Sequence, residues 1–150
     1  MDLAEFWVFF NSLLVEHFSC CAQRDGKGIH SRIFSYILHP EEEFVAIGQS
    51  QEVINGANPY PEHVVPCATL IKESFRLLDE GMPKREIAEL LAKHWKNVFI
   101  SKKQANYLDS KDRLNLKNRM PEDWKFEFGD TFARLQLANI QVLPINTIKP

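Results

Sequence analysis

Residues 62–71 read Glu-His-Val-Val-Pro-Cys-Ala-Thr-Leu-Ile, and this stretch passes from a strand pattern to a helix pattern. The two valines favour a short strand, and Pro66 ends it because proline cannot donate a ladder hydrogen bond. From Leu70 to Leu78 the apolar residues recur every three or four positions, which is typical of one helix face. We therefore predict a small mixed α+β domain in which a strand leads directly into a helix.

A second helix and a second strand are predicted after this one. Gly81 suits the left-handed position that follows a helix, and Pro83 is favoured in the first turn of the next helix. These two helices should form an antiparallel pair. Residues 98–100 then indicate a brief strand, and Ser101 and Gln104 match the S-x-x-Q capping box at the start of a further helix.

The residues before this region predict an apolar helix and a β-hairpin. Apolar residues at three- and four-residue steps favour a helix over residues 2–22, and further apolar residues cover most of its other sides. Such a helix is deeply buried or shared with a partner, so a homodimer through it is one prediction. After a turn at residues 24–28, residues 30–38 and 43–48 favour the two strands of a hairpin. A loop over residues 49–61 follows.

The C-terminal part of the chain carries shorter signals. Residues 120–124 predict a turn, Asp130 or Thr131 can cap a last helix, and residues 140–143 favour a last strand. A chain of 150 residues has the common size of one domain, and no internal repeat divides it. We therefore expect residues 1–150 to form a single domain.

The composition predicts a protein of the reducing cytoplasm. Apolar residues make up 45% of the chain and charged residues 25%, which is ordinary for a globular protein. The apolar run from Phe6 to Val15 is too short to span a bilayer, and the chain starts acidic where a secretory signal would be basic. Three cysteines cannot form an even-numbered disulfide framework. We expect a cytoplasmic protein without a membrane partner.

Basic residues concentrate in one window, although the net charge is -2. From Lys93 to Arg119 eight basic residues face two acidic ones, whereas residues 1–80 carry 12 acidic and 5 basic residues. Such a window could bind DNA, and the alternative is a solvated helix face. The candidate nucleic-acid-binding residues are Lys102, Lys103, Lys111, Arg113, Lys117 and Arg119.

The segment with concentrated chemistry is Glu62–Pro66, where a carboxylate stands beside an imidazole at a strand end. An acidic residue followed by His, two β-branched residues and Pro resembles the first half of the HNH, or ββα-metal, endonuclease motif. The resemblance implies hydrolysis of DNA phosphodiesters with one divalent cation, Mg²⁺ or Mn²⁺. It also implies His63 as the general base and Glu62 as a metal ligand.

The resemblance places the second half of the motif at the strand of residues 98–100 and the helix after it. Asn106 or Asp109 would present the remaining metal ligand, and residues 67–97 would be a helical insertion. His30 would approach the Glu-His pair if the hairpin pairs with its strand. The predicted parts of the domain are then an N-terminal apolar helix at 1–22, an HNH-like region at 30–110 and a C-terminal helix and strand at 111–150.

Other interpretations stay open beside the nuclease. One is a catalytically inactive phage or mobile-element protein that inhibits a nucleic-acid-processing partner, in the manner of an anti-CRISPR protein, through its basic window or its acidic half. Another is an assembly subunit that uses the first helix. Cys67 could also join His63, His94 or Cys20 in a zinc site. Finally, Cys67 could act as the nucleophile of a Cys/His dyad, because a helix start lowers the pKa of a thiol.

Overall fold

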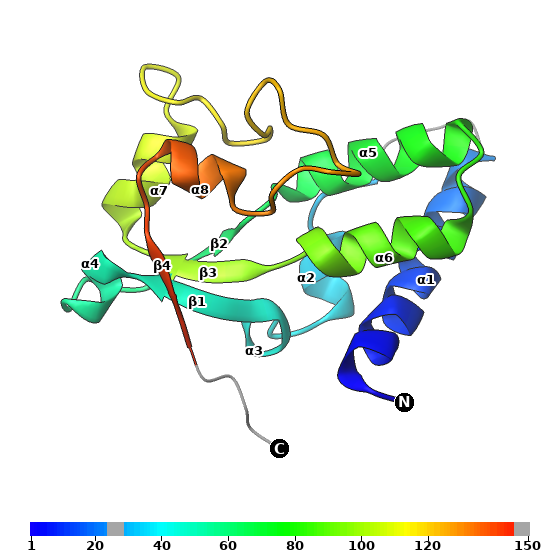
Figure 1. The fold of residues 1–150 in the computed structure, drawn as a ribbon, viewed down its shortest axis with the longest axis horizontal. Coiled ribbons are helices and arrows are strands. Elements are labelled where there is room, and N and C mark those ends of the chain that lie inside the picture. The colour runs from blue at the N-terminus through cyan, green and yellow to red at the C-terminus, as the bar shows by residue number, and fades with distance from the viewer. Residues whose placement is uncertain (24–28, 146–150) are drawn as a thin grey trace.

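The protein is an α+β domain in the computed structural model, which describes residues 1–23 and 29–145 (Figure 1). The helices are α1 (Leu3–Ala22), α2 (Ile33–Ile37), α3 (Glu42–Val45), α4 (Gln51–Ile54), α5 (Cys67–Asp79), α6 (Lys84–His94), α7 (Lys102–Asp109) and α8 (Ala133–Leu137). The strands are β1 (Ala46–Ser50), β2 (Tyr60–His63), β3 (Asn97–Ile100) and β4 (Val142–Pro144). The predicted fold class is confirmed.

The four strands form one mixed sheet in the order β2-β3-β1-β4. β1 pairs with β3 in parallel, whereas β4 and β2 run antiparallel to β1 and β3 respectively. In the β2–β3 ladder Glu62 lies opposite Val98 and His63 opposite Asn97. The ladder continues for one more bond, since Val64 N donates to Lys96 O at 2.8 Å. This pairing fixes the position of the Glu62-His63 segment.

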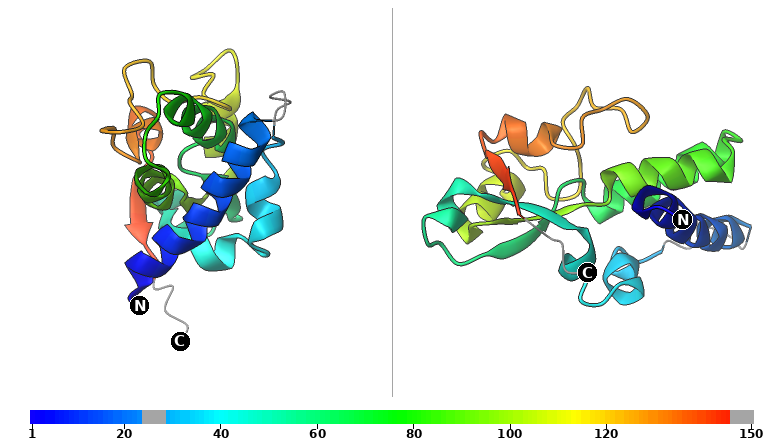
Figure 2. Two further views of the ribbon diagram at one scale, coloured as in Figure 1. Left: turned by 90° about the vertical axis from the view of Figure 1, so that its right-hand side faces the viewer. Right: turned by 60° about the horizontal axis from the view of Figure 1, so that its bottom comes forward.

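Two apolar cores meet at this segment. Helices α1, α5 and α6 gather at one end of the molecule and enclose the first core, and α7 and α8 lie against the sheet over the second (Figures 1 and 2). Val65 belongs to the first core and Val64 to the second, and both side chains are fully buried. The chain from Glu62 to Cys67 is therefore held from both sides.

Several local predictions are confirmed. The helical pair α5–α6 forms, and Gly81 between the two helices has a φ of 81°. Ser101 and Gln104 form the predicted capping box of α7. Strands β2 and β3 pair directly, and helix α7 follows β3 in the chain. The α5–α6 pair is inserted between the two strands in the sequence. The chain thus contains the ββα-like arrangement that was expected.

The predicted hairpin is wrong for residues 30–38. Residues Ile33–Ile37 form helix α2 and residues Glu42–Val45 form helix α3, so only the end of the predicted second strand survives, as β1. Packing overrides strand propensity, because Phe34 is fully buried with its ring centroid 4.8 Å from that of Trp95. The predicted turn at residues 24–28 lies outside the described residues.

Two further boundaries also differ from the predictions. The region expected as a loop contains α4, whose N-cap Ser50 accepts a hydrogen bond from Val53 N, and the first residues of β2. Helix α8 has Phe132 as its N-cap, without a side-chain cap. Asp130 still supports this helix start, because its Oδ1 accepts a hydrogen bond from Phe132 N at 2.7 Å.

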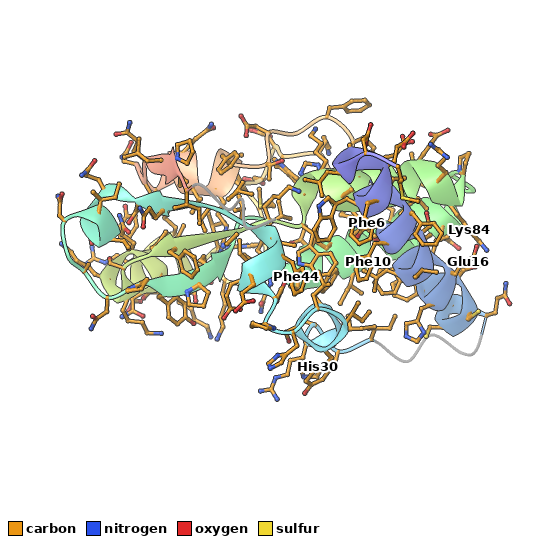
Figure 3. All side chains as sticks on the ribbon, turned by 90° about the horizontal axis from the view of Figure 1, so that it is seen from below. Phe6, Phe10, Glu16, His30, Phe44 and Lys84 are labelled. Carbon is orange, nitrogen blue, oxygen red and sulfur yellow. The ribbon has the colours of Figure 1, made fainter. Side chains whose placement is uncertain are left out.

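Helix α1 is confirmed, and one of its sides remains exposed. The side chains of Phe6, Phe9 and Leu13 are 45%, 57% and 57% exposed. Glu16 on the same helix pairs with Lys84 at 2.8 Å, which joins α1 to α6 (Figure 3). The homodimer through this helix stays a prediction. Within residues 1–23 and 29–145, no helix combines the length and the apolarity that a membrane crossing needs.

His94 anchors the long loop that precedes α8. Its ring is fully buried, with Nε2 2.8 Å from Phe126 O and Nδ1 3.0 Å from Thr131 Oγ1. Burial lowers the pKa of His94 to about 4 from an ordinary 6.5. The neutral ring therefore donates from Nε2 to the carbonyl and accepts the threonine hydroxyl hydrogen at Nδ1.

We expect this histidine to make the fold less stable in mild acid. The unfolded chain gains a proton near the ordinary pKa of 6.5, whereas the folded chain gains it only near about 4. Stability is thus present above the unfolded pKa and is lost as pH falls, by about 2 kcal/mol between roughly pH 7 and pH 5. Urea unfolding of the wild type and His94→Gln at both pH values measures this loss. An equal loss of stability in His94→Gln would mean that other groups cause it.

Candidate active site

A cavity of about 240 Å³ opens where the Glu62-His63 segment passes into α5. Titratable side chains from four parts of the chain line it: Glu41, Glu62, His63, Cys67 and Asp109. Glu41 precedes α3, the Glu-His pair ends β2, Cys67 begins α5 and Asp109 ends α7. The fold therefore gathers residues that are far apart in the sequence around one small space.

The imidazole of His63 is held by a buried carboxylate. Its Nε2 lies 2.6 Å from Glu41 Oε1, and the Glu41 side chain is only 5% exposed. Trp95 Nε1 donates to the same carboxylate oxygen at 2.5 Å. Because a carboxylate only accepts hydrogen bonds, His63 carries its hydrogen on Nε2. This leaves Nδ1 as the nitrogen that can exchange a proton within the cavity.

Cys67 lies beside this imidazole as the first residue of a 13-residue helix. The thiol and the imidazole influence each other. Burial opposes a charge on His63, but the interactions with Cys67 and Glu41 outweigh it and raise the pKa of His63 to about 10. Burial also raises the pKa of Cys67, while the neighbouring His63 acts to lower it. The three side chains form a carboxylate–imidazole–thiol series.

Helix α5 begins beside the cavity with backbone donors that have no acceptor within the helix. The first amides of a helix have no acceptor within the helix, and they carry the positive end of its dipole. Thr69 N bonds to Pro66 O at 2.9 Å, so the amides of Cys67 and Ala68 are the ones left at the helix end. Ala68 lines the cavity together with Cys67. These two amides therefore belong to residues that line the cavity.

Arg134 supports the opposite wall of the site. Its fully buried guanidinium donates to the Glu62 carboxylate, to His63 O at 2.5 Å and to Leu116 O at 2.9 Å. Asp109 Oδ1 lies 4.0 Å from the same guanidinium. Burial raises the pKa of Glu62, and the positive Arg134 opposes this shift. The arginine thus compensates the acids behind the cavity and fixes the backbone of His63.

The acids of this site do not fit a divalent cation as they are arranged. The guanidinium of Arg134 lies between Glu62 and Asp109, where a cation shared by these two carboxylates would be repelled. Glu41 is already engaged by His63 and Trp95. Within residues 1–23 and 29–145, no group of three or more His, Cys, Asp or Glu side chains is arranged to hold a metal ion.

The predicted site residues do not all lie together. Glu62, His63 and Asp109 line the same cavity, as the resemblance requires. Asn106 is exposed and lines a different cavity, next to Lys103 and Arg113. His30 is also exposed, and its Nδ1 accepts a hydrogen bond from Arg32 N at 3.1 Å, so it serves the turn before α2. The roles assigned to these residues stay predictions.

The predicted nucleic-acid-binding residues are all exposed but do not share one cavity. Lys102 Nζ lies 4.0 Å from the ring centroid of Tyr60, and Lys103 and Arg113 line the cavity of Asn106. Lys117 lines the cavity of Cys67. The remaining two are Lys111 and Arg119, the latter donating from Nε to Asn115 O at 2.8 Å.

Two residues of the site carry no sequence signal that identified them. Glu41 lies between the two segments predicted as hairpin strands, and its contact with His63 spans 22 residues of the chain. Trp95 is a buried core residue, and its indole N–H needs a hydrogen-bond partner when buried. A buried Trp beside a histidine-containing strand could have indicated an acidic acceptor. Arg134 pairs with Glu62, which is also distant in the sequence.

Comparisons with known proteins add no assignment to this geometry. No family model, curated protein or solved structure matches the chain.

Proposed function

We propose that the protein is a cysteine-dependent acyl hydrolase, with Cys67 as the nucleophile, His63 as the proton carrier and Glu41 as the residue that orients His63. The observation that carries this proposal is the Glu41–His63–Cys67 series, in which the thiol stands at a helix start. A nucleophile, a base and a group that orients the base are the parts that covalent acyl transfer needs.

The first half of the reaction forms an acyl-enzyme. The thiol of Cys67 first gives its proton to Nδ1 of neutral His63. The resulting thiolate attacks the carbonyl carbon of the substrate, and the carbonyl π electrons move to the oxygen. The amides of Cys67 and Ala68 donate to this oxyanion. As the tetrahedral intermediate collapses, the bond to the leaving group breaks, and the imidazolium of His63 gives that group a proton. Glu41 stabilises the imidazolium before this transfer through its 2.6 Å contact.

The second half releases the acid and restores the enzyme. Neutral His63 takes a proton from water, and the resulting hydroxide attacks the thioester carbonyl. The carbon–sulfur bond then breaks, so the Cys67 thiolate leaves and the imidazolium of His63 is restored. Each turnover therefore consumes one water molecule and cleaves one thioester bond. Trp95 contributes by holding Glu41 in place through its 2.5 Å hydrogen bond.

Turnover of a small thioester tests this proposal. We expect the wild type to release free thiol from an acetyl thioester, and Cys67→Ala to lower the rate by roughly 10³-fold, since the covalent route is then closed. Cys20→Ala is the matched control, because Cys20 is exposed on α1 and outside the cavity. Equal turnover by the wild type and Cys67→Ala would exclude the thiol from the reaction.

A metal-dependent DNA endonuclease is the second candidate. The observation that favours it is that β2, β3 and α7 bring Glu62, His63 and Asp109 to one cavity, in the order that the HNH resemblance implies. For a cation to bind there, the guanidinium of Arg134 must move away from its place between Glu62 and Asp109. Plasmid nicking with Mg²⁺ or Mn²⁺ separates the two candidates. The nuclease requires nicking that survives Cys67→Ala and is abolished by His63→Ala. A protein with neither activity would favour the inhibitory binding protein.

A further inference from the structure

We infer that the cavity at Cys67 binds acyl substrates that carry a carboxylate, and that Arg32 and Lys117 at its rim recognise this group. The inference rests on the proposed function and names its substrate class. Two cationic and three uncharged polar residues also line the cavity: Ser31, Arg32, Ser35, Lys117 and Asn118.

The two cations reach the rim from different parts of the chain. Arg32 is the N-cap residue of α2, and Lys117 lies in the loop after α7. Both side chains are exposed, and neither forms an ion pair with any of residues 1–23 and 29–145. A cavity flanked by two such cations attracts an anion, and low-dielectric walls strengthen the attraction.

Two of the three acids of the cavity are hydrogen-bonded to other side chains, and the third, Asp109, lies near Arg134 without a hydrogen bond at Oδ1 from the described residues. Glu41 is bonded to His63 and Trp95, and Glu62 is bonded to Arg134. Asp109, with its side chain 36% exposed, lies 4.0 Å from Arg134. The positive charge of Arg134 therefore interacts with Glu62 and Asp109. The charges of Arg32 and Lys117 remain available to bind an anionic ligand. The hydroxyls of Ser31 and Ser35 and the amide of Asn118 add uncharged polar groups to the same rim.

The size of the cavity limits the ligand. A volume of about 240 Å³ equals on the order of eight water molecules at their liquid volume. A short acyl chain with a terminal carboxylate fits this space. The planar guanidinium of Arg32 matches a carboxylate through two parallel hydrogen bonds. We therefore assign a short dicarboxylic acyl group, bound with its reacting carbonyl toward Cys67 and its free carboxylate toward the rim.

Alkylation of the thiol tests this assignment without any turnover. Iodoacetate and iodoacetamide differ by a carboxylate in place of an amide, and peptide mass spectrometry reports the label at each cysteine. We expect the ratio of iodoacetate to iodoacetamide rates at Cys67 to exceed that at exposed Cys20 by about tenfold. The double variant Arg32→Gln/Lys117→Gln should remove this excess. Lys111→Gln, an exposed cation outside the cavity, should leave it unchanged.

Four results would overturn the assignment. The ratio at Cys67 could survive the double variant, or Lys111→Gln could lower it equally, which would point to a general field. Cys67 could also react with neither reagent, since the cavity would then admit no small acyl group. Protection by succinate supports a carboxylate ligand, and protection by inorganic phosphate instead overturns it. Labelling that behaves as expected in a protein without thioester turnover would reject the hydrolase and keep the anion site.

Discussion

His63→Ala should lower the rate of thioester hydrolysis by roughly 10³-fold, about as much as Cys67→Ala. The reason is that His63 supplies the proton for the leaving group and later takes one from water. Because the two residues act as a unit, the double variant should be no slower than either single variant. Steady-state release of thiol by the three variants measures this. Additive losses would mean that His63 and Cys67 do not share a mechanism.

Glu41 provides a graded control for the same series. Glu41→Gln keeps the size of the side chain and removes its charge, so the imidazolium of His63 loses the partner at 2.6 Å. We expect a smaller loss than for His63→Ala, together with a lower pKa of His63 in an NMR titration. Restoration of a carboxylate at this position by Glu41→Asp should recover part of the rate. An unchanged rate in Glu41→Gln would remove Glu41 from the site.

Arg134→Met should destabilise the fold by about 3–5 kcal/mol, because it leaves Glu62 without its buried partner. The same substitution removes the donors to the carbonyls of His63 and Leu116. Urea unfolding monitored by circular dichroism measures the effect. A loss below about 1 kcal/mol would show that the guanidinium does not support this wall.

The matched test for this pair is the double variant Arg134→Met/Glu62→Gln. A neutral amide costs less than an unpaired carboxylate in the same place, so the double variant should be more stable than Arg134→Met alone. The pKa of Glu62 is already raised by burial, and loss of Arg134 raises it further. The defect of the single variant should therefore shrink as pH falls and Glu62 takes a proton. A defect that is independent of pH would assign the loss to packing.

Local sequence signals predicted the parts of the fold that depend on neighbouring residues. The Ser101 and Gln104 capping box and the Gly81 cap follow from backbone geometry within a few residues, and both are present. The change from strand to helix at Pro66 is present for the same reason. The α2 segment was mispredicted because its conformation depends on the burial of Phe34 against Trp95, a contact between distant residues.

Within the candidate site, too, local sequence signals identified some residues and missed those that only the tertiary fold brings together. The Glu62-His63 pair and Cys67 were visible because they are adjacent in the sequence, and their strand end and helix start are local features. Glu41 was not, because only the tertiary fold brings it to His63. The same holds for Arg134, whose acid partner is 72 residues away. The sequence alone favoured a metal-dependent role for His63. The contact between Glu41 and His63 instead favours a role for His63 as the base that serves the Cys67 thiol.

Mass spectrometry of the acyl-enzyme tests the central claim most directly. The protein is mixed with an excess of acetyl thioester, quenched in acid during turnover and digested, so that each cysteine is observed in its own peptide or by fragmentation. We predict one acetyl group on Cys67 in the wild type, and none on Cys67 in His63→Ala over the same time. Acetyl groups confined to exposed Cys20, or equal labelling of Cys67 with and without His63, would contradict a nucleophile activated by this histidine.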